Sequence, residues 1–243
     1  MARQPSDHML VRSEPRISAN ELAKYMVASE TGKIGIIRKA KESVTPPRTR
    51  YRDARPVLRA YLSDLKRDPR SVYTARAMFE QRSEDSARSE FIRSDALNSM
   101  DVLDSILRMQ NQLSGFAFES APQRQPFLEI AGVKVSVQLD LLLTRTRGSR
   151  EQIGGALFRM TRPDEDETEA AAAKRQDMGA YAATLVHMQV SENLAGNRDP
   201  YYRLCMSIDV QAEDVHIAPR TYVQRASNLT NACWFISSMW GKV

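Results

Sequence analysis

The chain has 243 residues, of which 42% are hydrophobic and 27% charged, so its composition supports a packed core. No apolar run approaches about 18 residues, which argues against a membrane-spanning helix, and the N-terminus lacks the apolar core of a secretion signal. The formal net charge of +5 is compatible with a nucleic-acid partner. The two cysteines, Cys205 and Cys233, have no neighbours at metal-ligand spacing, so we expect a reducing, cytoplasmic location.

The start of the chain divides into an arm and a helical region. Residues 1–16 are polar and lack hydrophobic periodicity, so we expect a disordered arm. Ser18 and Glu21 have the spacing of a capping box, which predicts that a helix begins there. We expect residues 17–90 to form a basic helical region.

Cations are concentrated between residues 33 and 59, where Pro46 and Pro47 interrupt any helix. Tyr51 lies among them, and a basic tract with an aromatic side chain can grip a phosphate backbone. The same composition is equally typical of a solvated connector. The residues that we expect to bind DNA or RNA are Lys39, Lys41, Arg48, Arg50 and Arg52.

Two amphipathic helices are predicted before the strands begin. The first runs from Arg52 to Leu65 and should turn its leucines, including Leu65 itself, inward. The second, from Ser94 to Leu113, has the strongest helical pattern. We expect its apolar stripe to pack on the sheet that follows; the stripe consists of Leu97, Met100, Leu103, Ile106, Leu107 and Gln110.

The segment from Pro126 to Arg162 reads as three consecutive strands. Alternation of apolar and polar residues from Val133 to Asp140 is typical of a strand with one buried face. Gly154 and Gly155 open the third strand and predict a bulge, or the close approach of another backbone or a ligand. The expected strands are Phe127 to Ile130, Val133 to Leu143, and Ile153 to Met160.

Asp140 is an acid inside this otherwise apolar region, and two interpretations of it are open. It lies at a solvated edge or forms a salt bridge to Arg145, Arg147 or Arg162. Alternatively it is a metal ligand, because carboxylate oxygens suit a hard cation such as Mg²⁺.

The remainder reads as helix, strand, short strand and helix. The long helix spans residues 168–190, and an alternating strand runs from Arg203 to Gln211. The terminal helix, from Ser227 to Trp240, carries Trp234. The three histidines are far apart and outside any zinc pattern, so we interpret His187 as a packed side chain.

From Ser94 to Gln211 the predicted order is helix, three strands, helix, strand. This αβββαβ order resembles the core of the PD-(D/E)XK nuclease superfamily, the fold of many restriction enzymes and RecB-type exonucleases. The resemblance implies an α+β fold, with a mixed α/β, three-layer-like core around a central mixed sheet. We expect residues 91–243 to form this core together with the C-terminal helix.

The resemblance also implies site residues. The family has a metal-binding aspartate on its second strand, where this chain has Asp140. Its third strand carries an acid, a spacer and a lysine, whereas this chain has no acid there and Arg159 as the strand's cation, which stays protonated and cannot act as a base. Glu129, on the first strand, would supply a second carboxylate for Mg²⁺. A weak site would then remain if Glu129, Asp140 and Gln152 converged.

The helix after the third strand often carries a glutamine and a tyrosine in RecB-like members. Gln176 and Tyr181 are similar, although they are five residues apart rather than four. The simpler interpretation is a surface glutamine and a core tyrosine. The expected catalytic residues are therefore Asp140, Glu129, Arg159 and Gln176, with Asp140 and Glu129 as metal ligands.

Two functions remain open at this point. One is a nuclease-like protein that interacts with nucleic acid, with weak or lost Mg²⁺-dependent cleavage of phosphodiesters. The alternative is a non-catalytic binding or assembly protein whose Trp-containing C-terminal helix mediates contact with a protein partner or a second copy. The sequence leaves open whether the protein is an enzyme.

Overall fold

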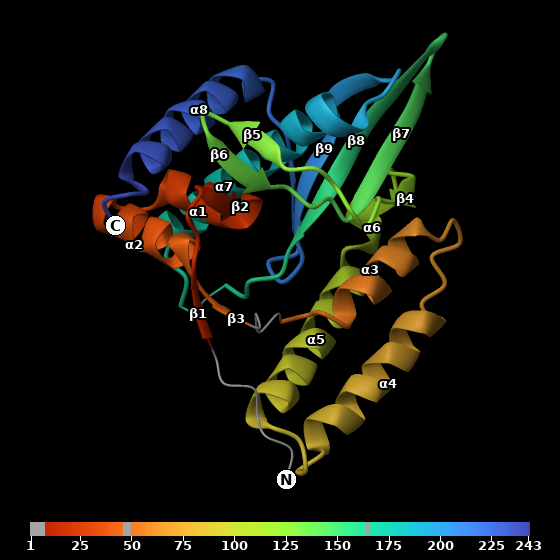
Figure 1. Ribbon diagram of the computed structural model, residues 1–243. Helices are drawn as coiled ribbons and strands as arrows, with labels where there is room; N and C mark the ends of the chain where they lie inside the picture. Colours follow the sequence, from red (N-terminus) through yellow and green to blue (C-terminus); the bar gives the residue numbers. More distant parts are fainter. Residues whose placement is uncertain (1–7, 46–49, 164–165) are drawn as a thin grey trace.

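The computed structural model describes residues 8–45, 50–163 and 166–243 (Figure 1). With 50% helix and 21% strand, it confirms an α+β fold. Nowhere in the described ranges is a helix both long and apolar enough to cross a membrane.

A five-stranded sheet forms the centre, in the order β10-β9-β8-β7-β4. Its neighbouring strands are antiparallel except for β8 and β9, which are parallel because the long helix α7 (Glu169–Gln189) joins them. The sheet is therefore mixed, as expected. Its strands are β4 (Phe118–Ser120), β7 (Leu141–Arg147), β8 (Arg150–Arg159), β9 (Asp199–Asp209) and β10 (Asp214–Ile217).

A smaller sheet of three strands has the order β2-β6-β5. The prediction of one strand from Val133 to Leu143 is wrong, because the chain leaves strand geometry over residues 137–140. The alternating half pairs in the small sheet, whereas the leucine-rich half pairs with β8 in the large one. The strands of the small sheet are β2 (Arg16–Ser18), β5 (Leu128–Ile130) and β6 (Val133–Ser136).

The expected disordered arm is wrong for residues 8–16, while residues 1–7 lie outside the described part of the chain. β1 (His8–Val11) pairs with β3 (Glu42–Thr45), and β2 pairs with β6. Directly before β2, the Pro15 carbonyl accepts a hydrogen bond of 2.9 Å from the backbone N–H of Lys134, in β6. Backbone pairing orders this segment without requiring hydrophobic periodicity in its sequence.

The helix predicted at Ser18 is confirmed as α1 (Ala19–Val27), with both hydrogen bonds of the capping box formed by Ser18 and Glu21. The helices predicted from Arg52 to Leu65 and from Ser227 to Trp240 are present with shifted bounds, as α3 (Ala54–Ser63) and α8 (Tyr222–Met239). The helix predicted from Ser94 to Leu113 is α5 (Glu90–Arg108) followed by α6 (Gln110–Leu113). The remaining helical segments are α2 (Glu30–Lys41), which was not predicted as a separate helix, α4 (Arg70–Glu84) and the π-helical turn Val190–Leu194.

Two apolar clusters cover opposite faces of the five-stranded sheet, which gives three layers. On one face, α1, α7 and α8 pack against Ile153, Leu157 and Cys205. On the other, α3, α4 and α5 pack against Phe158 and Met206. Helices from residues 17–90 contribute to both clusters, so residue 90 is not a boundary between two cores.

The predicted close approach at the paired glycines is confirmed. The register between β8 and β9 shifts between Ile153 and Gly155. A Cβ atom on Gly154 would lie 2.1 Å from the Leu204 carbonyl oxygen, and one on Gly155 would lie 2.6 Å from Cδ1 of Leu139. Neighbouring protein atoms therefore explain both glycines.

Candidate functional site

Asp140 lies directly before β7 and is only 2% exposed. Its two carboxylate oxygens accept hydrogen bonds of 2.8 and 2.9 Å from Nη1 of Arg55, on α3. One of them also accepts a 2.7 Å hydrogen bond from the backbone N–H of Phe158. The Asp140 backbone is fixed as well, because its N–H donates to the Ala156 carbonyl at 2.8 Å. The residue thus joins α3 to the middle of the sheet.

Burial raises the pKa of Asp140, and the neighbouring Arg55 guanidinium opposes that rise. The salt-bridge interpretation of this acid is correct in kind, but the expected partners Arg145, Arg147 and Arg162 were wrong. Arg55 shares the inward face of α3 with Leu58 and Leu62, at a spacing of three and seven residues. A cation on an apolar helix face was the signal that sequence reasoning missed.

The other expected carboxylate, Glu129, lies in the small sheet, where it is exposed and opposite Lys134. Across residues 8–45, 50–163 and 166–243, no three Asp, Glu, His or Cys side chains are grouped so that they could hold one metal ion. Because Arg55 and Phe158 already occupy the Asp140 oxygens, these residues do not fit a Mg²⁺ site in this arrangement.

Gln176 and Tyr181, on α7, follow the simpler interpretation. Gln176 is exposed, and Tyr181 is buried with its hydroxyl accepting a 3.2 Å hydrogen bond from Asn228. Neither side chain has a hydrogen bond to Asp140 within the described chain. They read as surface and core residues of the helix.

Arg159 ends β8 in a buried charge network rather than in an open site. It pairs at 3.2 Å with Asp209, at the end of β9, and Asp209 also accepts from Arg175 at 3.2 Å. Arg175 in turn donates to Glu167 at 3.0 Å. Burial lowers the pKa of Arg159, with Asp209 opposing the shift. This network connects β8, β9 and α7.

The predicted nucleic-acid tract is divided between different elements. Lys39 and Arg52 are exposed, whereas Lys41 donates to the Trp240 and Val243 carbonyls at 3.0 and 2.6 Å. Arg50 lies 5.2 Å from the centre of the Phe91 ring. The expected Arg48 lies outside the described residues. A role of these cations in nucleic-acid binding stays a prediction.

A second set of cations lies on the hairpin formed by β7 and β8, which projects beyond the body of the molecule (Figure 1). Residues 145–151 are exposed without interruption, so neither face of this tip is covered. The tip turns at Gly148, which has a φ of +63°, a backbone conformation that glycine adopts without strain. Its cations are Arg145, Arg147 and Arg150.

Two of the cations on this tip are placed close to each other. Arg147 lies directly opposite Arg150 in the antiparallel register, and like charges in that position are destabilising. Arg150 has one carboxylate partner, Asp199, at 3.7 Å, and both side chains are largely exposed, so that pair contributes little. The exposed tip thus carries three arginines and one acid, Glu151.

No protein-family model matches the sequence, and a search of curated proteins finds no match.

Proposed function

We propose that this protein binds nucleic acid through the tip of the β7–β8 hairpin and does not cleave it. The observation that carries the proposal is the projecting, uncovered hairpin with Arg145, Arg147 and Arg150. A two-stranded β-ribbon fits the major groove of duplex DNA, and arginines provide both phosphate contacts and donors for base edges. The net charge of +5 favours the same partner.

The surroundings of Asp140 support the proposed absence of cleavage. Metal-dependent hydrolysis of a phosphodiester needs carboxylate oxygens free to bind the ion. Here those oxygens accept hydrogen bonds from Arg55 and Phe158, and Arg159 is held by Asp209. We therefore propose a PD-(D/E)XK-like scaffold in which the former catalytic position has become an internal clamp.

Binding is tested by fluorescence anisotropy with labelled duplex DNA, single-stranded DNA and RNA at increasing salt. Replacing both Arg147 and Arg150 by Gln should lower the slope of log affinity against log salt by about 2, because each phosphate contact contributes about 0.9. The double substitution of Lys39 and Arg52 by Gln removes equal charge from the tract predicted by sequence and serves as the matched control. A hairpin variant that binds like wild type would contradict the proposal.

Cleavage is tested with plasmid and single-stranded DNA in Mg²⁺ or Mn²⁺, using wild type and Asp140→Asn. We expect no cleavage by either protein. Cleavage by wild type that disappears in Asp140→Asn would establish a metal nuclease and overturn the non-catalytic part of the proposal.

A second candidate function is self-association through α8. The outward face of this helix carries exposed Val223 and Trp234, with exposed fractions of 66% and 64%. Between and beyond them lie the exposed neutral residues Ser227, Asn231 and Ser238, so the face has no formal charge. In a chain with a net charge of +5, such a face lets a second copy approach without like-charge repulsion.

Light scattering tests this second function directly. Self-association predicts a mass near twice the 27.5 kDa of one chain, and Trp234→Glu should return it to one chain. Leu65→Glu, at another highly exposed apolar position, is the control. A wild-type protein that stays monomeric at high concentration would contradict this function.

A further inference from the structure

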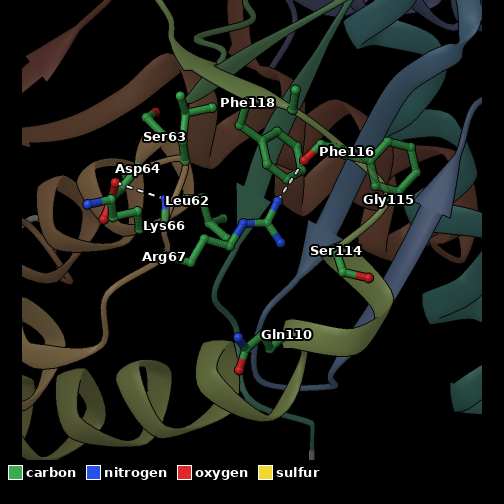
Figure 2. A pocket seen from close by; sticks show the side chains of 12 residues that line it. Leu62, Ser63, Asp64, Lys66, Arg67, Gln110, Ser114, Gly115, Phe116 and Phe118 are labelled. Carbon is green, nitrogen blue, oxygen red and sulfur yellow. Dashed lines mark hydrogen bonds between the residues drawn. The ribbon is translucent and has the colours of Figure 1, made fainter.

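A cavity of about 440 Å³ lies between the C-terminal end of α3 and the segment that leads into β4 (Figure 2). A volume of a few hundred cubic ångströms is typical of sites for small ligands. β4 is antiparallel to β7, with Phe118 opposite Leu143. The residues before β4 therefore lie on the side toward which β7 runs to Arg145 and the hairpin tip, which places the cavity on the hairpin side of β4.

Two cations line this cavity, and within the described chain neither has an ion-pair partner. Lys66 is exposed. Arg67 is held in one orientation, because its Nη2 donates to the Phe116 carbonyl at 2.6 Å and its guanidinium lies 5.6 Å from the Phe118 ring centre. Figure 2 shows this hydrogen bond at the wall of the cavity. The remaining N–H groups of Arg67 are available to an anion.

The turn that presents these cations is strained. Arg67 has a φ of +46°, an unfavourable conformation for a residue with a side chain. The turn is fixed by Asp64, whose carboxylate accepts hydrogen bonds from the backbone N–H groups of Lys66 and Asp68, each at 3.1 Å. Backbone strain of this kind concentrates at ligand sites. The Asp64 carboxylate thus stabilises the turn, while Lys66 and Arg67 remain without a carboxylate partner among the described residues.

The lining of the cavity also includes an aromatic ring and neutral polar groups. Phe116 is partly exposed, and its ring centre lies 6.0 Å from that of Phe118. Gln110 also lines the cavity and presents an amide that can both donate and accept. Leu65 is 94% exposed beside the cavity, although its helical spacing predicted an inward position, because α3 ends at Ser63.

We propose that this cavity takes one unstacked nucleotide unit, with its base against Phe116 and Gln110 and its phosphate on Lys66 and Arg67. A planar base joined to a phosphate is recognised by an aromatic ring, by an amide that both donates and accepts hydrogen bonds, and by neighbouring cations. The inference rests on the proposed function, since the hairpin would hold the strand from which this nucleotide comes. It adds a preference for single-stranded or unpaired regions.

The test compares a labelled short oligothymidylate with a labelled duplex. Phe116→Leu keeps an apolar side chain but removes the stacking surface, and Lys66→Gln removes an exposed charge. Each should weaken oligothymidylate binding about tenfold and leave duplex binding within about twofold. Tyr73→Leu, which removes an exposed aromatic ring from α4, is the matched control and should change neither affinity. Thermal melting of all variants checks that the fold is retained.

The outcomes separate this inference from the proposed function. If the Arg147 and Arg150 double variant loses duplex binding while Phe116→Leu and Lys66→Gln bind oligothymidylate like wild type, the cavity inference is wrong and the hairpin proposal survives. If wild type binds neither probe, both are wrong. Competition by free thymidine monophosphate that disappears in Phe116→Leu would support the cavity with an isolated nucleotide as its ligand.

Discussion

Charged side chains at the two ends of the hairpin strands β7 and β8 differ in burial and in pairing. At the end near the core, Asp140 and Arg159 are buried and each is paired with an opposite charge. At the tip, Arg147 and Arg150 are exposed and face each other. Buried, paired charges connect elements of a fold, whereas exposed, opposed charges are available to a partner. Charge therefore connects elements of the fold at one end and, in the function that we propose, contacts nucleic acid at the other.

The largest expected effect concerns Gly154, which lies between the two ends. In Gly154→Ala the new Cβ would meet the backbone carbonyl of Leu204 at 2.1 Å, so β8 and β9 would have to separate. We expect a loss of about 3 kcal/mol or more in the free energy of unfolding, measured with urea. Gly155→Ala is the control, because its closest contact is the end of the Leu139 side chain, which can move. Equal losses in the two variants would contradict the claim that the close approach of the β9 backbone requires glycine at position 154.

The second largest expected effect concerns Asp140, at the end of the hairpin strands near the core. Asp140→Ala leaves the Phe158 N–H without its acceptor and Arg55 without its counter-charge. We expect a loss of about 3 kcal/mol, at the low end for broken buried pairs because Arg55 is partly exposed. Asp140→Asn keeps an acceptor oxygen and should lose less. An alanine variant as stable as wild type in urea would show that Asp140 is not a clamp.

The third expected effect concerns the like-charged pair of arginines at the tip. Replacing Arg147 and Arg150 by Gln removes a like-charge pair, so the protein should gain up to about 0.5 kcal/mol in stability. The gain should shrink at high salt, because exposed charges are screened. Urea unfolding at two salt concentrations measures it. A clear loss of stability would mean that these arginines support the fold.

The smallest expected effect concerns His187, on α7. Burial lowers the pKa of His187 from its ordinary value of 6.5, so its contribution to stability is present above that pH and is lost as the pH falls below it. His187→Phe should keep the ring contact with Tyr222, now 4.4 Å between ring centres, without titrating. The melting temperature of wild type should therefore fall more between about pH 7.5 and pH 5.5 than that of the variant. Identical falls would contradict the assignment.

Features encoded over a few residues were predictable from the sequence. The Ser18 capping box and the glycines at the β8 bulge each act on neighbours along the chain or on a strand directly alongside. The Asp140 partner was not predictable in this way, because Arg55 lies 85 residues away and pairing at that distance depends on tertiary packing. The split between β6 and β7 was missed for a similar reason, since the choice of sheet depends on which strand lies beside each half.

Binding at the hairpin tip is best measured as the dissociation constant for labelled duplex DNA at two salt concentrations. The measurement compares wild type, Asp140→Asn and the Arg147→Gln/Arg150→Gln double variant. We predict that Asp140→Asn binds like wild type, and that the double variant binds more weakly with a salt slope lower by about 2. Loss of binding in Asp140→Asn, together with unchanged binding in the double variant, would contradict this prediction.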